Sequence, residues 1–375
     1  MRVHVVDPSA YTPPYDNALC GALAAAGAEV ELFTSRFAYG SVPSPQSYAR
    51  RDFFYRAALG PPGSRARRVA KLAEHVPDML RYRHAARAAD IVHFQWLTVQ
   101  HLDGYLLPAR RLPSGGRRQL VLTAHDILPR EPRPGQLAAQ RRLYERFDAL
   151  VVHSEHGRRR LTTELGIDSA RIHVIPHGAF VASPELSPAP DLSSAPPLLP
   201  SQTDGPVVLF FGLLRPYKGL DLLLDAWRGI DGAELWIVGM PRMDISSLRA
   251  AAPASVRFVP RFVPDAEMAR YFARADLVVL PYREIDQSGV AFTALGSRVP
   301  LLLSDVGGFP ELAATGAART FPAGDPVTLR NSLRELLSDP GARAAMAERA
   351  RVAAAGPYSW DAIARRTLDL YESLS

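Results

Sequence analysis

Two cations lie three residues apart after a buried apolar run. In "FFGLLRPYKGLDLLLDAW", residues 210–227, the run ends at Gly212, and Arg215 and Lys218 precede a helix that we expect to begin near Gly219. Arginine offers a planar fork and lysine a point charge, and both suit phosphate oxygens. Cations are unfavourable near a helix N-terminus unless an anion joins them. The spacing therefore predicts phosphate binding, with two exposed cations at a helix entrance as the simpler alternative.

A second polar stretch, Gln287-Ser288-Gly289-Val290, opens a predicted helix after another buried run. Free amides at a helix N-terminus bind anions, and the Ser288 hydroxyl adds a donor. Gly289 has no side chain to keep a ligand away from the backbone. Ordinary helix capping by Ser288 is the alternative. Because the chain also lacks an Asp-x-Asp pair, this stretch and the two cations together predict a diphosphate held without a metal ion.

The composition is typical of a soluble protein with two domains. The chain has 375 residues, of which 47% are apolar and 22% are charged, and this length exceeds one ordinary core. No apolar run is long enough to span a bilayer, and the first residues, "MRVHVVD", lack the apolar stretch of a signal peptide. The single Cys20 allows no internal disulfide, which suits a reducing compartment. We therefore expect a cytoplasmic protein.

Short apolar runs alternate with helical patterns on both sides of a stretch that holds seven prolines, residues 181–206. Such a proline density predicts an extended linker. The apolar runs predict parallel strands at residues 2–6, 29–34, 90–95, 119–125, 149–154, 172–178, 207–212, 234–239, 256–260, 277–282 and 300–305. The pattern predicts two doubly wound, Rossmann-like α/β domains facing a central cleft, with ligands at the carboxyl ends of the strands. The predicted boundaries are 1–182, a linker at 183–206, 207–357, and a helix at 358–375 that packs back on the N-terminal domain.

Motifs in both halves point to one family. The C-terminal half contains "GLLRPYKGLDLLLDA", "IVG", "ADLVVLPYREIDQSGV" and "VPLLLSDVGGFPEL", and the N-terminal half contains "LTAHDILP", "VVHSEHGRRRL" and "VIPHGAF". Through them, essentially the whole chain resembles the family 4 retaining glycosyltransferases, which have the GT-B fold. The resemblance implies metal-independent hexosyl transfer from a UDP- or GDP-linked sugar, with no cofactor, to a hydroxyl acceptor. Surface glycan, glycolipid or secondary-metabolite synthesis would be its setting.

The resemblance also implies roles for single residues, with acceptor binding in the N-terminal domain and donor binding in the C-terminal domain. Arg215 and Lys218 would hold the donor diphosphate, and His125 would orient the donor sugar; these three form the expected catalytic set. The expected donor-binding residues are Gly212, Gly239, Arg261, Glu284, Asp286, Gln287, Ser288, Gly289, Val290 and Thr293. Residues at predicted strand ends or in loops are expected to bind the acceptor, and these are Tyr15, Asp16, Phe94 and Trp96.

The chain departs from the family's pattern at two places. The family commonly carries two glutamates eight residues apart, where this chain has Ile285 and Thr293. Glu284 and Asp286 are the neighbours able to replace the first glutamate, and Thr293 offers one hydroxyl in place of the second. A paired-glycine loop after the first strand is replaced by residues 7–19. These departures predict a subgroup with Gln-Ser-Gly-Val in place of the first glutamate motif.

The positive charge lies in the N-terminal half. Residues 1–183 carry 25 Lys and Arg against 16 Asp and Glu, whereas the remaining residues carry 19 against 22. Residues 47–76 mix arginines with Phe53, Phe54 and Tyr55. This mixture favours peripheral contact with an anionic membrane, at the inner face of the plasma membrane. An amphipathic helix packed on its own domain is the alternative, and no nucleic-acid partner is expected.

Three other functions remain open at this point. A nucleotide-sugar epimerase of similar fold would need carboxylates that this site lacks. A sugar phosphorylase would use the same cations for inorganic phosphate. A non-catalytic partner subunit is the third alternative, because Ile285 and Thr293 replace the two glutamates.

Overall fold

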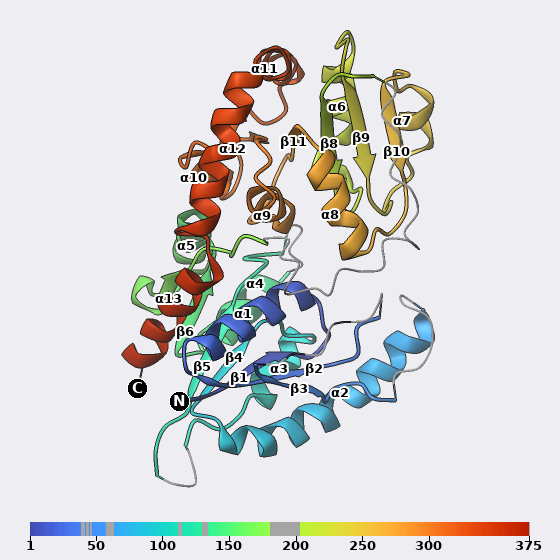
Figure 1. Ribbon diagram of the computed structural model, residues 1–375. Helices are drawn as coiled ribbons and strands as arrows, with labels where there is room; N and C mark the ends of the chain where they lie inside the picture. The colour runs from blue at the N-terminus through green and yellow to red at the C-terminus, as the bar shows by residue number, and fades with distance from the viewer. Residues whose placement is uncertain are drawn as a thin grey trace. The chain divides into compact units, whose positions relative to one another are not determined.

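The computed structural model describes residues 1–38, 42, 45, 47–57, 64–111, 115–129, 134–180 and 203–374 (Figure 1). The chain forms two compact units, Met1–Pro176 with Trp360–Ser375, and His177–Ser359. Each unit contains one parallel sheet, so the predicted pair of doubly wound α/β domains is confirmed. Most of the predicted linker at 183–206 lies outside the described residues.

The sheet of the first unit has the strand order β3-β2-β1-β4-β5-β6-β7. Its strands are β1 (Arg2–Asp7), β2 (Glu29–Thr34), β3 (Ala49–Asp52), β4 (Ile91–Phe94), β5 (Gln119–Thr123), β6 (Ala149–Val152) and β7 (Ile172–Val174). The α-helices of this unit are α1 (Pro13–Ala25), α2 (Arg65–Ala85), α3 (Gln100–Leu106), α4 (Gln136–Tyr144), α5 (Glu155–Leu165) and α13 (Trp360–Ser373). Every residue of β4, β5 and β6 is buried, which explains why apolar residues predominate in them.

The sheet of the second unit has the order β10-β9-β8-β11-β12-β13. Its strands are β8 (Val207–Phe211), β9 (Glu234–Val238), β10 (Val256–Val259), β11 (Leu277–Leu280), β12 (Leu301–Ser304) and β13 (Ala318–Phe321). Its α-helices are α6 (Leu220–Trp227), α7 (Ser246–Ala250), α8 (Asp265–Arg274), α9 (Gly289–Gly296), α10 (Phe309–Ala313), α11 (Pro326–Ser338) and α12 (Pro340–Ala355). Both sheets therefore follow the same connectivity, with the direction of winding reversed after the third strand of each.

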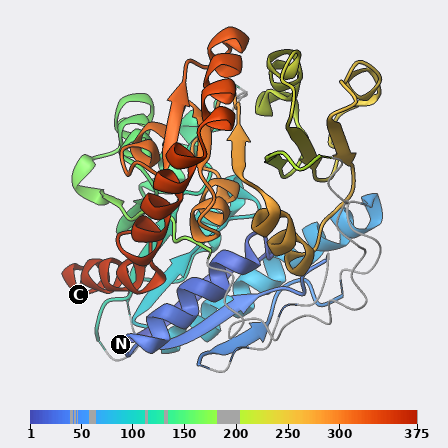
Figure 2. The same ribbon diagram turned by 45° about the horizontal axis from the view of Figure 1, so that its top comes forward.

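The C-terminal helix α13 belongs to the first unit. It packs against α1, and Figure 2 shows the two helices side by side. The Tyr371 hydroxyl on α13 lies 2.6 Å from Nδ1 of His93 on β4, and both side chains are buried. This hydrogen bond ties the end of the chain to the middle of the first sheet.

Two strands, β3 and β13, escaped the sequence prediction. Both lie at an edge of their sheet, and both are short, with the sequences "ARRD" and "ARTF". An edge strand has one neighbour and polar surroundings, so it needs no continuous apolar run.

Candidate functional site

The candidate site lies where the winding of the second sheet changes direction, between β8 and β11. These strands are parallel neighbours in the sheet, although β9 and β10 lie between them in the sequence. From β8 the sheet continues to one side through β9 and β10, and from β11 it continues to the other side through β12 and β13. Loops that leave the carboxyl ends of two such strands diverge and leave room for a ligand. Arg215 and Lys218 follow β8, and the Gln287–Val290 stretch follows β11.

Gly212, the first residue after β8, lies against both halves of the site. Its φ of +113° favours glycine. A Cβ atom placed on Gly212 would lie 2.9 Å from Nζ of Lys218 and 3.3 Å from Cγ2 of Val290. Lys218 is buried, and its ammonium lies 4.9 Å from the centre of the Tyr282 ring. The structure therefore brings the lysine and the start of α9 together at one backbone position.

Two further glycines let the loops approach each other closely. Gly239 has a φ of +143°, and a Cβ there would lie 1.9 Å from the carbonyl oxygen of Gly212. Gly219 has a φ of +67°, and a Cβ there would lie 2.0 Å from the carbonyl oxygen of Pro281. A side chain at either position would force the strand ends apart, so both glycines shape the site through the backbone.

Arg283, which sequence reasoning missed, fastens the two loops together. Its amide donates to the carbonyl of Tyr217 at 2.7 Å, and its guanidinium donates to the carbonyl of Pro216 at 2.9 Å. The same guanidinium pairs with both carboxylate oxygens of Asp221, at 3.0 and 2.6 Å. The Arg283–Asp221 ion pair is half exposed, so it contributes little to stability. The bonds of Arg283 nevertheless hold in place the loop backbone that directly follows Arg215. Its position four residues before Gln287, at the start of the loop that carries the Gln-Ser-Gly-Val motif, is the signal that could have identified it.

Arg215 itself is exposed. No ion pair or hydrogen bond of its side chain occurs within the described part of the chain. A fixed loop that carries an exposed guanidinium beside a buried ammonium offers two different cations to one anion.

The start of α9 is arranged differently from an ordinary capped helix. Ser288 occupies the N-cap position, but its side chain accepts no hydrogen bond from the helix. Its amide donates instead to Oε1 of Gln287 at 3.2 Å, so this amide is engaged, contrary to expectation. The amides of Gly289 and Val290 have no acceptor among the described residues, and a Cβ on Gly289 would meet no atom within 4 Å. Two donors and an open approach remain for an anion.

Three other expected donor residues, Thr293, Arg261 and Asp286, form hydrogen bonds or ion pairs with neighbouring residues. The Thr293 hydroxyl donates to the Gly289 carbonyl at 3.0 Å within α9. Arg261 pairs with both carboxylate oxygens of Glu267, a buried residue. The carbonyl oxygen of Asp286 accepts from the amide of Gly308 at 3.3 Å.

In the first unit, His125 follows β5 and lies in a chain of hydrogen bonds. Nδ1 of His153 lies 3.0 Å from the carbonyl oxygen of Ile175, so this nitrogen carries the proton. Burial lowers the pKa of His153 to about 4, so the ring is neutral at pH 7 and its Nε2 is an acceptor. Nε2 of His153 lies 3.1 Å from Nδ1 of His125; therefore Nδ1 of His125 donates.

This chain fixes the tautomer of His125. Once Nδ1 carries the proton, the Nε2 of a neutral His125 is an acceptor. It lies 3.1 Å from Oε1 of Gln95, whereas the side-chain nitrogen of Gln95 has no partner among the described residues. With the amide group turned over, the Gln95 nitrogen donates to His125, and both groups are satisfied. His153 and Gln95, neither of them expected, are thus positioning residues for His125.

Aromatic rings hold His125 from two sides. The Trp96 ring stacks on it at 5.0 Å between centroids, with the planes 14° apart. The Tyr15 ring meets it edge-on at 4.8 Å. Nε1 of Trp96 donates to the Thr12 hydroxyl at 3.0 Å. Of the four expected acceptor residues, Trp96 is the one whose side chain is partly exposed.

Two family models match the chain, one in each half. The model described as "Glycosyl transferase 4-like domain" matches residues 14–178, and the model described as "Glycosyl transferases group 1" matches residues 205–339. The two matches include the loops that carry His125, Arg215 and Lys218. The chain belongs to the family 4 type of glycosyltransferases.

Relatives agree with this assignment, and solved structures share the fold. The D-inositol 3-phosphate glycosyltransferase of Kineococcus radiotolerans is 28% identical to this glycosyltransferase, over 93% of this chain and 87% of its own. A GDP-mannose-dependent monoacylated alpha-(1-6)-phosphatidylinositol monomannoside mannosyltransferase of Corynebacterium glutamicum is 27% identical, over 64% and 66%. Sucrose-phosphate synthase from Thermosynechococcus elongatus has a TM-score of 0.74 at 21% identity, over 100% of this chain and 99% of its own. Anabaena HepE in complex with UDP and glucose has a TM-score of 0.69 at 19% identity, over 100% of both chains. The predicted GT-B fold is confirmed.

Three of the four expected acceptor residues of the glycosyltransferase are buried, and these are Tyr15, Asp16 and Phe94. Phe94 lies in the core of the first unit, with no exposed surface. Asp16 is 1% exposed and shares a hydrogen bond with Asp7. Asp7 accepts from the amides of Ser9 and Tyr11, at 3.2 and 2.6 Å, so it is the ionised member of the pair. As the structure has them, neither Phe94 nor Asp16 presents its side chain to an acceptor.

Asp16→Asn is expected to raise the free energy of unfolding at neutral pH by about 1 kcal/mol or more, since one pKa unit is worth 1.4 kcal/mol. Burial, with the Asp7 charge nearby, raises the pKa of Asp16 well above its usual range. The folded chain therefore keeps a proton that the unfolded chain releases above about pH 4. This cost is absent below the unfolded pKa and grows as the pH rises toward the folded pKa. The side-chain amide of the Asn variant has no proton that unfolding would release, so this pH-dependent cost is absent. The amide still donates a hydrogen bond to Asp7.

Urea unfolding at about pH 4.5 and about pH 7 measures this difference. The gain should be larger at the higher pH. Asp369→Asn, which changes an exposed carboxylate of α13, is the matched control and should show no such trend. An equal effect of Asp16→Asn at both pH values would contradict a shared proton.

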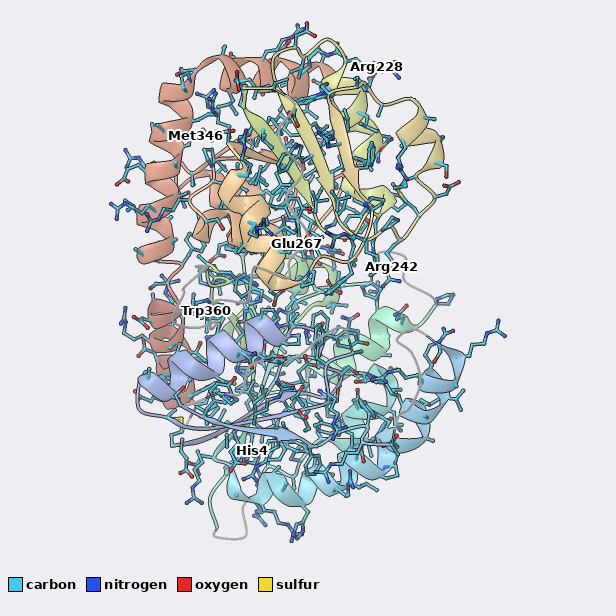
Figure 3. All side chains as sticks on the ribbon, turned by 45° about the vertical axis from the view of Figure 1, so that its right-hand side comes forward. His4, Arg228, Arg242, Glu267, Met346 and Trp360 are labelled. Carbon is cyan, nitrogen blue, oxygen red and sulfur yellow. The ribbon has the colours of Figure 1, made fainter. Side chains whose placement is uncertain are left out.

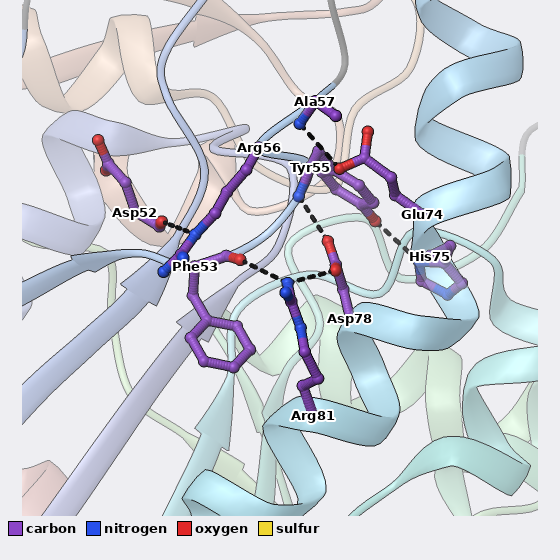
Figure 4. A network of polar contacts seen from close by, with 9 residues as sticks. All are labelled: Asp52, Phe53, Tyr55, Arg56, Ala57, Glu74, His75, Asp78 and Arg81. Atoms are coloured by element: carbon purple, nitrogen blue, oxygen red, sulfur yellow. Dashed lines mark hydrogen bonds and ion pairs between the residues drawn. The ribbon is translucent and has the colours of Figure 1, made fainter.

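The segment expected to contact a membrane is tied into the first unit. Phe54 and Tyr55 are buried in its core, so their rings are not available to lipid. Figure 4 shows how the loop is held: the Tyr55 amide donates to Asp78 at 2.6 Å, and its hydroxyl lies 2.8 Å from Nδ1 of His75. The Ala57 amide donates to Glu74 at 3.0 Å. The exposed apolar side chains among the described residues of this segment, Val69 and Leu72, lie on α2.

No helix among the described residues combines the length and the apolar character that crossing a bilayer requires.

Proposed function

We propose that this glycosyltransferase transfers a hexose, with retention and without a metal ion, from a UDP- or GDP-linked sugar to a hydroxyl acceptor. The observation that carries the proposal is the convergence of Lys218 and the start of α9 on Gly212. Arg215 directly precedes the loop residue Pro216, whose carbonyl accepts a hydrogen bond from Arg283. A buried ammonium, an exposed guanidinium and two unsatisfied amides suit a diphosphate.

The same groups explain the chemistry. Positive charge grows on the anomeric carbon as the nucleoside diphosphate leaves, and negative charge grows on the diphosphate. Preorganised donors aimed at such a charge are worth about 3–4 kcal/mol each. The acceptor hydroxyl attacks on the face that the diphosphate leaves, and a diphosphate oxygen takes its proton. His125, held in one tautomer by His153, orients the donor sugar and need not act as the base.

The names of the relatives support the donor and acceptor classes. One relative is named as GDP-mannose-dependent, and HepE was solved with UDP and glucose. Two relatives are named for inositol-containing acceptors. We therefore place this chain in glycan, glycolipid or secondary-metabolite synthesis, with a glycan, a lipid-linked sugar or a small molecule as acceptor. Peripheral contact with an anionic membrane, through the exposed face of α2, belongs to the proposal, because Val69 and Leu72 are exposed there beside arginines.

A nucleoside diphosphate is expected to bind the purified chain equally well with and without EDTA. The reason is that Arg215, Lys218 and the α9 amides supply the positive potential that a metal would otherwise provide. Calorimetric titration with UDP and with GDP, in EDTA and in magnesium, measures it. Loss of binding in EDTA would contradict metal independence. Sugar release from a panel of UDP- and GDP-sugars then identifies the donor, and turnover that requires added inorganic phosphate would indicate a phosphorylase instead.

A further inference from the structure

A pocket lined by arginines lies in the first unit, at the amino edge of its sheet. It has a volume of about 680 Å³ and is lined by Leu80, Arg83, His84, Arg87, Ala109, Arg111 and Arg118. Arg118 directly precedes β5. The candidate donor site lies at the carboxyl edge of the other sheet, so this pocket belongs to neither the donor site nor the His125 cluster.

Three of the arginines present their charge without a partner. Arg83 lies in the last turn of α2 and Arg87 lies just after its end, and both line the pocket. Arg111 follows the loop after α3. All three are exposed, and none forms an ion pair or side-chain hydrogen bond with another described residue. No carboxylate is among the described residues that line the pocket.

Neighbouring arginines behave differently. Arg110 and Arg117 both pair with Asp148, at 3.3 and 2.6 Å. The carboxylate of Asp90, which lies close enough to act on Arg118, accepts the amide of Arg2 at 2.8 Å. The lack of acids in the pocket is therefore a local property and not a shortage of acids in this part of the unit.

Arg118 supplies an independent sign that the pocket takes an anion. Its side chain is 1% exposed, and Nε donates to the carbonyl of Ala89 at 3.2 Å, while Nη1 donates to the carbonyl of Ala109. Nη2 is buried and has no partner. Burial lowers the pKa of Arg118, and the charge of Arg87 adds to this effect, whereas Tyr82 and the Asp90 carboxylate act in the opposite direction. A buried guanidinium with an unsatisfied donor beside like charges is costly unless an anion compensates it.

We propose that the arginine pocket binds a ligand through a phosphate group, with Arg83, Arg87 and Arg111 contacting the phosphate oxygens. Arginine forks match phosphate geometry, and the charge of Arg118 at the pocket wall adds to the attraction. Leu80, 49% exposed, gives the pocket an apolar side for the organic part of the ligand. A soluble phosphate ester and a lipid headgroup share this chemistry.

Calorimetric titration with inorganic pyrophosphate tests the pocket in the full-length chain. The expected result is two sites in the unaltered protein, one in the arginine pocket and one at Lys218. The double variant Arg83→Ala/Arg87→Ala should lose one site, or weaken it at least ten-fold, and keep the other. Lys218→Met should lose the site at Lys218 and keep the site in the arginine pocket. A wrong assignment of the donor site would therefore be detected independently of the arginine pocket. Donor turnover of the double variant should remain normal.

Arg159→Ala is the matched control, because Arg159 is an exposed arginine of α5 in the same unit and does not line the pocket. Equal losses in this variant and in the double variant would show general charge attraction and would overturn the proposal. Pyrophosphate binding that the double variant leaves unchanged would also overturn it.

Sedimentation with phosphatidylcholine vesicles, with and without phosphatidylglycerol, identifies the source of the phosphate. A loss of vesicle binding in the double variant that matches its loss of pyrophosphate binding would assign the pocket to a lipid headgroup. A loss with pyrophosphate alone would assign it to a soluble phosphate ester. Both outcomes support a phosphate site, and they separate its two sources.

Discussion

Replacing Lys218 by methionine is expected to lower turnover by about 100-fold to 1000-fold, because a preorganised donor to a leaving group is worth about 3–4 kcal/mol. Methionine keeps most of the volume of the buried side chain and removes the charge. The packing against Tyr282 is thereby largely kept, and the free energy of unfolding should change by about 1 kcal/mol or less. Steady-state kinetics on the identified donor and urea unfolding give the two numbers.

Arg215→Ala should produce a similar loss of turnover with no loss of stability, since the side chain is exposed and the loop is held by Arg283. Arg228→Ala is the matched control. Arg228 is an exposed arginine at the far end of α6, and Figure 3 shows it at the opposite end of the unit from Arg242, whose amide bonds the Leu214 carbonyl. Near-normal turnover of Lys218→Met and Arg215→Ala would remove both residues from the catalytic set.

The architecture could be predicted because strands buried on both faces need continuous apolar runs. Runs such as "VVLFF" and "LVVL" are buried throughout, and each gave a strand close to its observed bounds. Edge strands obey a weaker constraint. In β3, no residue is fully buried, so "ARRD" carries no period that sequence analysis could detect.

The site could be predicted in part for a related reason. Parallel strands point their carboxyl ends to one edge, so cations after β8 and amides after β11 must meet there. What could not be predicted is which groups satisfy one another. The bond between Gln287 and the Ser288 amide and the bond from Arg283 to Pro216 depend on rotamers and loop paths that no local pattern specifies.

The same limit applied to the aromatic residues near 53–55. Their mixture with arginines is typical of a membrane-facing segment, yet Phe54 and Tyr55 fill the core of the first unit. The amide of Tyr55 reaches Asp78, and its hydroxyl reaches His75. Partners so distant in the sequence decide whether an aromatic side chain is buried, and composition does not contain that information.

Gly289→Val is expected to weaken nucleoside diphosphate binding at least ten-fold, about 1.4 kcal/mol, and to leave the fold intact. The structure makes this test clean. A Cβ at Gly289 would meet no protein atom within 4 Å, and its φ is not in the left-handed region, so neither packing nor backbone strain requires glycine. The added side chain instead stands beside the Gly289 and Val290 amides, where a phosphate must touch the backbone.

Two companion variants separate anion binding from helix capping. Ser288→Ala should change stability by only a few tenths of a kcal/mol, below the roughly 1 kcal/mol typical of a true cap, because the Ser288 side chain accepts no bond from the helix. Its effect on ligand affinity should be smaller than that of Gly289→Val, since a single hydroxyl is removed. Gly21→Val is the matched control: this glycine of α1 also has room, its nearest atom being Oγ of Ser47 at 4.0 Å. If calorimetry found Gly289→Val as tight a binder as Gly21→Val, the start of α9 would be an ordinary helix terminus, and the diphosphate would have to be held by Arg215 and Lys218 alone.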